Sequence, residues 1–504
     1  MKIIFLISII LIELFNIILA EGNIISLPIE SFQYQGEKNE EQEQTILDKL
    51  LDSKISSIVN IGYNPYPLKA FLDSKNPYFY ISNNCYISKS ILSSFDYQKN
   101  FNYNRHTSKS FYNTSNFDLS FSQSRHACTA KEDFEIFKMN KMETFKEYFD
   151  FILAEDTKED ETNCLFIGLL ESQNPESDFK YYNLIPQLKQ KGIIEKLCWT
   201  MKFNMPVNYD KDYIIYDADE LLNLKGTLYI GNYPHFFDSN NYYESQFVKT
   251  YAAFGQNMMK LNLKFNKVYY RHDNKEIKFD EDKIIDLNPS QYLIIGPEEY
   301  FDSILENFFN KYLENHICHY HYMEEYTGIY CEKSEKFSIN EIKFFPTLFF
   351  EHVEFEYIFS LSFQDLFIEK DGKYYFMIIT DTLYVKDQWI LGNIFMRKYQ
   401  FIFNLESKEI GFYNPNFEIK ENSNKNKDSS KIILYVLLII SLCVIVVGIG
   451  FFIKMKFYPS VLKKKRANEL DDEYEYVSHK NNTNNNDNNN DNDNQLFNNS
   501  INSE

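Results

Sequence analysis

The stretch WILGNIFMRKY, residues 389–399, carries more information about the fold than any other part of the sequence. Outward from it, the body of the chain consists of many short runs rich in Tyr, Phe, Ile and Val, separated by Asn, Asp, Ser, Gly and Pro, which is typical of strands joined by turns. The 46 Phe and 39 Tyr favour sheets in the same way. The sequence therefore predicts an all-β body with short helices, the clearest at residues 184–195 and 300–313.

Further segments accompany this stretch in a fixed order along the chain. They are IGYNPY with FLDSK (61–66, 71–75), FIGL with NLIPQLK and GII (166–169, 183–189, 192–194), GTLYIG (226–231), and FN with IGF (403–404, 410–412). Together with residues 389–399 they resemble the pepsin-like aspartic protease family, which has Trp-Ile-Leu-Gly-Asp-x-Phe-Leu-Arg-x-Tyr at the last site and a Trp where this chain has Tyr80. The resemblance covers residues 47–416.

The resemblance implies a bilobal body around an interlobe cleft in which a peptide lies beneath a flap hairpin. Each lobe of such a protein contributes one Asp-Thr/Ser-Gly loop, and a sheet made by both lobes lies under the cleft. We expect an N-terminal β lobe at residues 47–205 and a C-terminal β lobe at residues 206–416.

The first of these loops reads Asp73-Ser74-Lys75. Hydrolysis in this family needs two carboxylates that share one proton. Glycine after the aspartate permits a backbone conformation that a side chain opposes, and this chain has Lys75 there. A cation beside Asp73 favours its ionised form and works against the shared proton.

The second loop departs further from the family. Counting back from Gly296-Pro297 without a gap, the catalytic position falls on Asn288, whose amide has no titratable proton. A two-residue insertion would instead place Asp286 there, although the residues after it also fail the motif. We expect Asp73 and Asn288 to face each other at hydrogen-bonding distance, with the amide donating to the carboxylate.

The flap departs as well, because the position of the family's Tyr is Phe121 and the next residue is Ser122. The leading hypothesis is a catalytically impaired member of the family that binds peptide or protein. The alternative is an active, atypical aspartic endopeptidase in an acidic compartment, and a structural coat protein without a ligand is a third hypothesis. None of these needs a cofactor.

Two apolar stretches predict the topology. Residues 1–20 read as a cleaved signal peptide. Residues 432–453 carry no charge and are long enough to cross a hydrocarbon core, and the basic residues from Lys454 to Arg466 predict a cytoplasmic flank. We therefore expect a single-pass membrane protein whose body lies in the lumen of the secretory or vacuolar pathway or outside the cell.

The remaining segments are short or polar. Residues 21–46 read as a short propeptide or N-terminal linker, residues 417–431 as a linker, and residues 454–504 as a disordered cytoplasmic tail that ends in an Asn/Asp tract. Within that tail, Tyr474–Val477 forms a Tyr-x-x-apolar pattern similar to peptides that sorting adaptors bind.

Seven cysteines occur, of which Cys443 lies in the apolar stretch 432–453. The other six are disulfide candidates because the compartment is oxidising. They are Cys85, Cys128, Cys164, Cys198, Cys318 and Cys331. A loop closed by Cys318 and Cys331 is favoured over a zinc site that would add His319 and His321, since the spacing matches no zinc pattern, and no metal is expected.

The net charge of −20 excludes a nucleic-acid surface, which would need a basic patch. In the predicted luminal part, Asn113 in Asn113-Thr114-Ser115 is the expected glycosylation site. The expected partners are therefore a peptide or protein ligand and the membrane, with no nucleic acid.

Overall fold

The computed structural model of the chain describes residues in the range 24–416. The gaps within this range are 33–44, 63–65, 75–76, 83–108, 115–118, 122–123, 139–142, 155–163, 171–181, 205–214, 253–260, 274, 324 and 382–386. The expected lobe boundary near residue 205 falls at one of these gaps, and Lys75, Ser122 and Cys85 lie outside the described residues.

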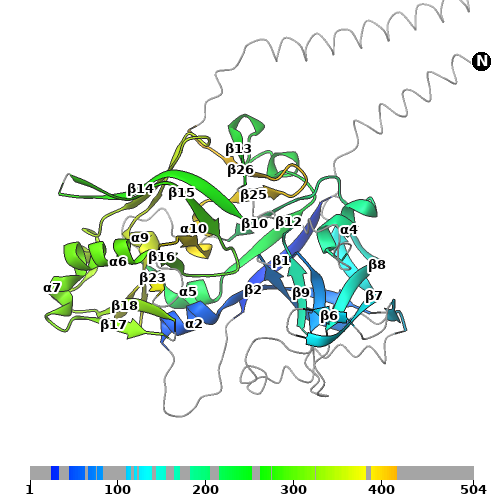
Figure 1. Ribbon diagram of the computed structural model, residues 1–504, viewed down its shortest axis with the longest axis horizontal. Helices are drawn as coiled ribbons and strands as arrows, with labels where there is room; N and C mark the ends of the chain where they lie inside the picture. The colour runs from blue at the N-terminus through cyan, green and yellow to red at the C-terminus, as the bar shows by residue number, and fades with distance from the viewer. Residues whose placement is uncertain are drawn as a thin grey trace, which may run out of the picture. The chain divides into compact units, whose positions relative to one another are not determined.

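The described residues form a mostly β structure with two sheets and short helices (Figure 1). In the first sheet the strands follow one another in the order β13, β26, β25, β10, β12, β1, β2, β3, β9, β4, β8, β7 and β5, with β6 paired to β7. Their bounds are β1 (Ile25–Phe32), β2 (Lys54–Ile61), β3 (Tyr66–Asp73), β4 (Phe79–Ser82), β5 (Tyr112–Asn113), β6 (Leu119–Phe121), β7 (Ser124–Lys138), β8 (Glu143–Ala154), β9 (Cys164–Gly168), β10 (Cys198–Phe203), β12 (Lys225–Ile230), β13 (Phe247–Tyr251), β25 (Phe401–Asn404) and β26 (Glu409–Tyr413).

The second sheet contains only strands from after residue 215. Its order is β11, β21, β22, β18, β23, β16, β24, β15, β14, β19 and β20, with β17 paired to β18. The bounds are β11 (Tyr216–Asp217), β14 (Asn262–His272), β15 (Lys275–Leu287), β16 (Ile294–Gly296), β17 (Cys318–Tyr322), β18 (Tyr326–Glu332), β19 (Leu348–His352), β20 (Tyr357–Leu361), β21 (Phe367–Lys370), β22 (Lys373–Phe376), β23 (Ile378–Asp381) and β24 (Ile390–Leu391).

The first sheet joins the two halves of the chain. Strands β12, β13, β25 and β26 come from the expected C-terminal lobe, yet they share this sheet with β2, β3 and β9 of the expected N-terminal lobe. The two sheets pack on one continuous apolar core that includes the fully buried Trp199 and Trp389. The body thus holds together through a sheet to which both halves contribute.

Strand β1 lies within residues 21–46, for which the sequence predicts a short propeptide or N-terminal linker. It lies inside the first sheet, paired antiparallel with β12 on one side and with β2 on the other. Ile25, Leu27 and Ile29 alternate along it and are buried, which is the period of a strand with one face in the core. Residues 25–32 are therefore an integral part of the body.

The helices are short. They are α2 (Ile46–Asp52), α4 (Leu184–Gln190), α5 (Ala218–Leu222), η2 (Pro234–Phe236), η3 (Glu244–Gln246), α6 (Glu298–Ile304), η4 (Leu305–Phe309), α7 (Asn310–Leu313), α8 (Ile339–Ile342), α9 (Phe363–Leu366) and α10 (Asn393–Lys398). The prediction of helix at 300–313 is confirmed, because α6, η4 and α7 follow one another without a break.

The helix expected at 184–195 is shorter than predicted, because α4 ends at Gln190. Gly192 follows with a φ of +66°, a left-handed conformation that glycine adopts at low cost and that ends helices. The Ile193 amide then donates to the Leu188 carbonyl at 2.9 Å, which closes the last turn. The apolar residues after Gly192 therefore pack outside the helix.

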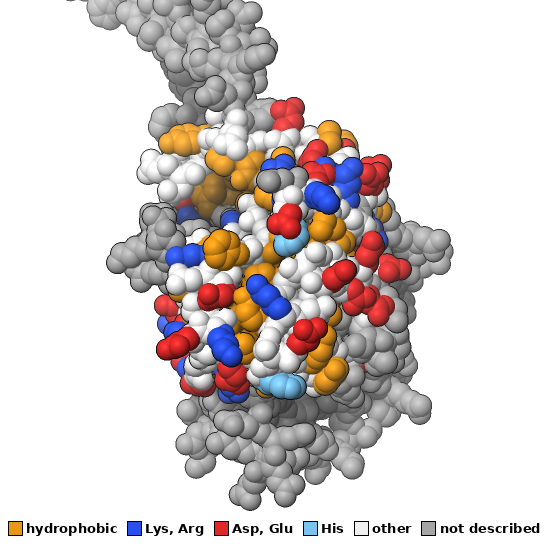
Figure 2. Space-filling model, turned by 90° about the vertical axis from the view of Figure 1, so that its left-hand side faces the viewer, with side chains coloured by type: hydrophobic (Ala, Val, Ile, Leu, Met, Phe, Trp, Pro, Cys, Tyr) orange, Lys and Arg blue, Asp and Glu red, His pale blue; other side chains and the backbone are white. Residues whose placement is uncertain are grey.

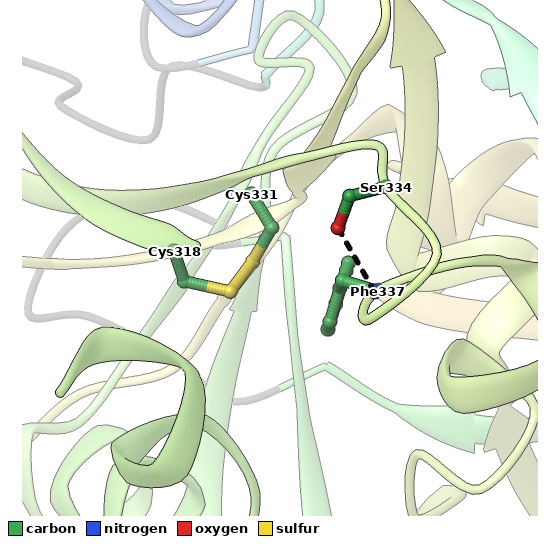
Figure 3. Close-up of a disulfide and its surroundings, with 4 residues drawn as sticks. All are labelled: Cys318, Cys331, Ser334 and Phe337. Atoms are coloured by element: carbon green, nitrogen blue, oxygen red, sulfur yellow. Dashed lines mark hydrogen bonds between the residues drawn. A yellow bond between two sulfur atoms is a disulfide. The ribbon is translucent and has the colours of Figure 1, made fainter. Parts of the chain in front are cut away.

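Cys318 and Cys331 form the expected disulfide (Figure 3). They face each other in the paired strands β17 and β18. This bond removes both thiolates from the zinc alternative, and His321 instead places Nε2 3.0 Å from Asp48 Oδ1 on α2. Cys198, another disulfide candidate, is a buried free thiol in the described part of the chain, and burial raises its pKa to about 12. Cys128 is buried in β7.

Several other predictions fall on residues that the structure does not describe. These are the signal peptide, the stretch 432–453, the linker 417–431, the tail 454–504 with Tyr474–Val477, and Cys443. Among the described residues, no helix is both long enough and apolar enough to span a membrane. On the face shown in Figure 2, acidic and basic side chains are interspersed.

Candidate functional site

The first candidate loop begins where β3 leaves the first sheet. The strand runs parallel to β9, and Asp73, its last residue, lies opposite Gly168. The Leu169 amide donates to the Asp73 carbonyl at 2.9 Å. Ser74 follows and is buried. The two segments that the sequence singled out, 71–75 and 166–169, are thus neighbours in space.

The second candidate loop also follows a strand that is paired in parallel with its neighbour, here in the second sheet. Strand β15 runs parallel to β24, with Leu287 opposite Leu391. Asn288 follows β15 directly, and its amide nitrogen donates to the Leu391 carbonyl at 2.9 Å. Asn288 thus lies at the end of a strand in the second sheet, as Asp73 lies at the end of β3 in the first.

Two crossed hydrogen bonds join the loops across 200 residues of sequence. Ser74 Oγ donates to Asn288 Oδ1 at 2.8 Å, and both residues are buried. Ser290 Oγ donates to the Leu72 carbonyl at 2.8 Å. Each loop thus offers a serine hydroxyl to the other. These bonds hold the Asp73 end of β3 beside the Asn288 end of β15.

The side chain of Asn288 contacts both loops. Its Oδ1 accepts from Ser74 Oγ and from the Ser290 backbone amide at 3.2 Å, which uses both lone pairs. Its Nδ2 donates to Gln291 Oε1 at 3.2 Å. The expected bond from this amide to the Asp73 carboxylate stays a prediction, since Nδ2 has a second N–H beyond the one donated to Gln291.

Gly392 lets the second loop approach the segment that leads into α10. A Cβ at this position would collide with the backbone carbonyls of Gln291 and Leu293. The Asn393 amide, at the start of α10, donates to the Gln291 carbonyl at 2.6 Å. The glycine of the WILGN stretch is therefore required by close backbone packing beneath the loop.

Asp286, the alternative catalytic candidate, lies two residues before Asn288 on β15, opposite Ile390. Gln388 Nε2 donates to its Oδ2 at 2.7 Å, and Asn262 Nδ2 donates to its Oδ1 at 3.5 Å. The parallel pairing with β24 thus separates Asp286 by two positions from the residue that matches Asp73.

The surroundings of Asp73 include Tyr80, the residue at the position of the family's Trp. The Tyr80 ring stacks on Phe166 with the ring centroids 4.5 Å apart. Burial raises the pKa of the Tyr80 phenol, and the negative charge of Asp73 raises it further. Tyr80 therefore lies within electrostatic reach of the carboxylate and stays protonated.

The remaining predicted residues lie on hairpins of the first sheet. Phe121 ends β6 and pairs with Ser124 at the start of β7, so it stands at a hairpin end, as a flap residue would. Asn113 pairs with Ala130 in β5, and the neighbouring Thr114 is exposed.

Sequence reasoning missed Ser74, Ser290 and Gln291 as residues that hold the loops together. The available signal was a serine in each loop close after the catalytic position. Which acceptor each serine would find depends on how two distant strands pair, and no local pattern contains that information.

The chemistry of the two loops follows from these contacts. A water-activating pair needs two carboxylates in proton exchange. Here the first loop supplies Asp73, and the matching position of the second supplies a carboxamide that cannot titrate. Asn288 retains one N–H beyond its bond to Gln291 that can be donated to a ligand. Within the described residues, no group of three or more His, Cys, Asp or Glu side chains could hold a metal ion.

Comparisons with known proteins give one distant similarity to report. No family profile matches the sequence, and no curated protein matches it. Among solved structures, the chain is similar to basic 7S globulin from soybean, with 11% sequence identity and a TM-score of 0.49. The similarity covers 79% of this chain and 96% of that one.

Proposed function

We propose that the chain is a membrane-anchored protein with a pepsin-like, bilobal body whose catalytic pair has become Asp73 and Asn288, and that it binds peptide or protein without efficient cleavage. The motifs that occur in the family's order between residues 61 and 412 support the family assignment. The apolar stretch 432–453 with its basic flank supports the anchor. The body then lies in the lumen of the secretory or vacuolar pathway or outside the cell.

One observation carries the loss of catalysis, namely the hydrogen bond from Ser74 Oγ to Asn288 Oδ1 at 2.8 Å. This bond, together with the pairing of β15 with β24, supports the proposal that an amide stands where a shared-proton pair needs its second carboxylate. Asp286 offers a carboxylate, but it lies two residues earlier on β15, where Gln388 and Asn262 donate to it. Binding remains open to this site, since the second N–H of Asn288 can be donated to a ligand.

A cleavage assay at mildly acidic pH tests the catalytic half of the proposal. The full chain in detergent is incubated with a peptide mixture, with and without a statine-type transition-state mimic, beside the Asp73→Ala variant. We expect the wild-type protein to release no more product than this variant. Product that the mimic suppresses and that Asp73→Ala lacks would favour an active endopeptidase.

A peptide array tests the binding half. We expect the wild-type chain to retain a subset of immobilised peptides, and Asp73→Ala to retain fewer of them because an acceptor at the loops is lost. If neither protein gives a signal on any peptide above that of the bare support, the result would contradict binding at this site.

A further inference from the structure

The face formed by η2, β13 and β26 carries a group of aromatic rings with lysines among them. The group consists of Tyr233, Phe236, Phe247, Tyr251 and Tyr413, with Lys196 and Lys249, and we call it the aromatic patch. Phe236 is 54% exposed and Tyr251 is 71% exposed. Contiguous groups of exposed rings mark interaction surfaces more often than single exposed rings do.

Strand geometry places these rings on one side of the sheet. Phe247, Lys249 and Tyr251 alternate along β13, so they share a face, while Thr250 between them is buried. Phe247 lies opposite Tyr413 of β26, with ring centroids 5.1 Å apart. Gly411 follows on the same face of β26, where a Cβ would overlap the Phe247 ring.

The rings extend without a break from β13 to η2. The Phe247 ring centroid lies 5.0 Å from that of Tyr233, and Tyr233 in turn lies 6.5 Å from Phe236. Lys196 places its Nζ 4.4 Å above the Tyr233 ring and 4.6 Å above the Phe236 ring. Lys249 Nζ pairs with Glu409 at 2.8 Å. The rings are thus bordered by the two ammonium groups and the exposed Tyr251, while the Tyr233 and Tyr413 hydroxyls accept from the Asn404 side chain and the His235 amide.

The chain leaves the described body beside this patch. β26 is the last strand before residue 416, and the Asn414 amide donates to the Gln246 carbonyl, directly before β13, at 2.9 Å. Asn414 Nδ2 also donates to the Phe355 carbonyl at 3.0 Å, which fixes the exit point. Residues 417–431 reach at most about 50 Å when fully extended, before the apolar stretch 432–453 begins.

We propose that the aromatic patch rests on the lipid bilayer into which residues 432–453 insert. Aromatic rings with polar tips and lysine ammonium groups are the side chains that settle at the boundary between head groups and acyl chains. The face next to the exit point is the one that a short tether holds nearest to the bilayer. This inference depends on the proposed membrane anchor.

Tryptophan fluorescence of the full chain reconstituted in phosphatidylcholine vesicles tests the inference. Trp199 and Trp389 are fully buried, so a new exposed tryptophan is a distinct probe. Phe236→Trp and Tyr251→Trp place the probe in the patch, and Phe344→Trp, at a site that is 83% exposed in the turn after α8, is the matched control. Lipids brominated near the head group quench only probes that touch them.

We expect the two patch probes to lose emission in brominated vesicles relative to ordinary ones, while Phe344→Trp keeps its emission. Equal behaviour of all three probes in a chain that floats with the vesicles would overturn the inference and leave the anchor intact. A chain that alkaline carbonate washes from the vesicles would contradict the anchor and the inference together. If the emission of the patch probes changes with protein concentration in detergent, a second copy of the chain covers the aromatic patch. That result would also overturn the inference.

Discussion

An aspartate at position 288 could accept the same hydrogen bonds that Asn288 accepts. Ser74 Oγ and the Ser290 amide both donate to Oδ1, and a carboxylate would accept both bonds. Gln291 would only need to turn its amide to donate instead of accept. We expect Asn288→Asp to change the free energy of unfolding by less than about 1 kcal/mol. Asn288→Ala, which leaves the buried Ser74 hydroxyl without its acceptor, should cost roughly 1–3 kcal/mol in denaturant titrations. A larger loss in Asn288→Asp than in Asn288→Ala would contradict this account of the loop.

His352 makes the body sensitive to acid. It is 2% exposed and stacks on Phe355 with the ring centroids 4.2 Å apart. Burial lowers its pKa from 6.5 to about 4. Between pH 6.5 and 4 the imidazole is therefore protonated in the unfolded chain but not in the folded one. The free energy of unfolding falls as the pH drops through this range, by up to about 3 kcal/mol.

His352→Asn keeps an acceptor for the Phe355 amide and removes the titration. We expect this variant to lose less stability than wild type over the same pH range, measured by thermal unfolding of the full chain. His272→Asn, at the more exposed end of β14, is the control and should follow wild type. Parallel pH profiles for wild type and His352→Asn would contradict the assignment.

At the residue scale, the sequence predicted the two loop positions but not the contacts between them. Asp73 and Asn288 could be found because each follows an apolar strand and precedes a recognisable segment. The bond from Ser74 to Asn288 could not, since it depends on packing between residues 214 positions apart. The expected bond from Asn288 to Asp73 stays a prediction.

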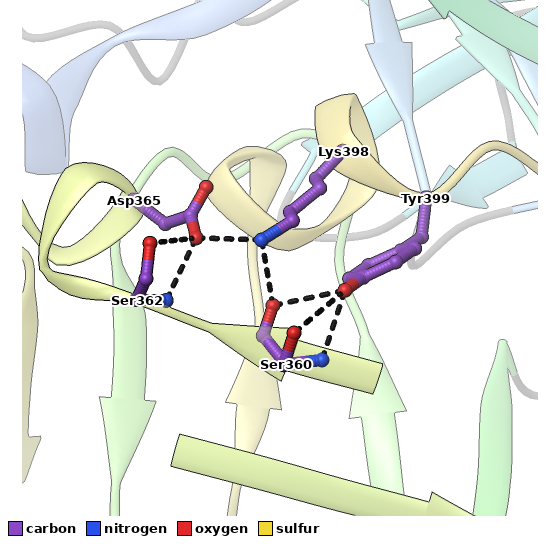
Figure 4. Close-up of polar contacts among 5 residues, drawn as sticks. All are labelled: Ser360, Ser362, Asp365, Lys398 and Tyr399. Carbon is purple, nitrogen blue, oxygen red and sulfur yellow. Dashed lines mark hydrogen bonds and ion pairs between the residues drawn. The ribbon is translucent and has the colours of Figure 1, made fainter. Parts of the chain in front are cut away.

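At the scale of elements, α10 is anchored beneath the second loop by a buried ion pair (Figure 4). Lys398 Nζ lies 2.7 Å from Asp365 Oδ2, and the Asp365 side chain is 3% exposed. Asp365 also accepts from the Ser362 amide at 2.8 Å and so caps α9. Tyr399 donates to the Ser360 carbonyl at 2.9 Å beside them. These contacts fix the helix that begins directly after Gly392.

We expect Asp365→Asn to destabilise the body by roughly 2–3 kcal/mol, because Lys398 keeps its charge and loses the carboxylate. Glu369→Gln is the matched control, since the Lys333–Glu369 pair is more exposed, at 47% and 34% for the two side chains. It should cost less than about 1 kcal/mol. Equal midpoints for the two variants in urea unfolding would show that the buried pair does not anchor α10.

Local sequence patterns predict some of the helices and strands and miss others. Alternation in residues 25–32 is a strand signal, but the segment stands before the first motif, where a short propeptide or N-terminal linker was expected. Its pairing with β2 and with β12, about 200 residues later in the chain, makes it part of the sheet. The helix at 300–313 was predictable because its residues contact one another locally, whereas the end of α4 depends on one glycine.

At the scale of the whole molecule, the all-β class followed from composition and turn spacing, whereas the sharing of one sheet by both halves of the body came only from the family resemblance. Composition and local patterns cannot show that sharing, because strands such as β10 and β25 pair over about 200 residues. The membrane topology remains a prediction from residues 432–466.

Glycosylation tests that topology. If the body is luminal, Asn113 is modified, while Asn481 and Asn498, which also stand in acceptor triplets, are not. We expect glycosidase to increase the gel mobility of wild type but not of Asn113→Gln. An Asn481→Gln variant should shift like wild type. A glycosidase shift in Asn113→Gln as large as in wild type would reverse the assignment.

The central claim is that the pair Asp73 and Asn288 disables catalysis. Its most direct test is peptide turnover at mildly acidic pH by four forms of the full chain: wild type, Asp73→Ala, Asn288→Asp, and Asn288→Asp combined with Lys75→Gly. We predict no turnover by wild type, Asp73→Ala or Asn288→Asp, and turnover by the double variant, because Asn288→Asp alone keeps the cationic Lys75 two residues after Asp73. Turnover by wild type that Asp73→Ala abolishes would contradict the claim, and Asp286 would then be the partner to test.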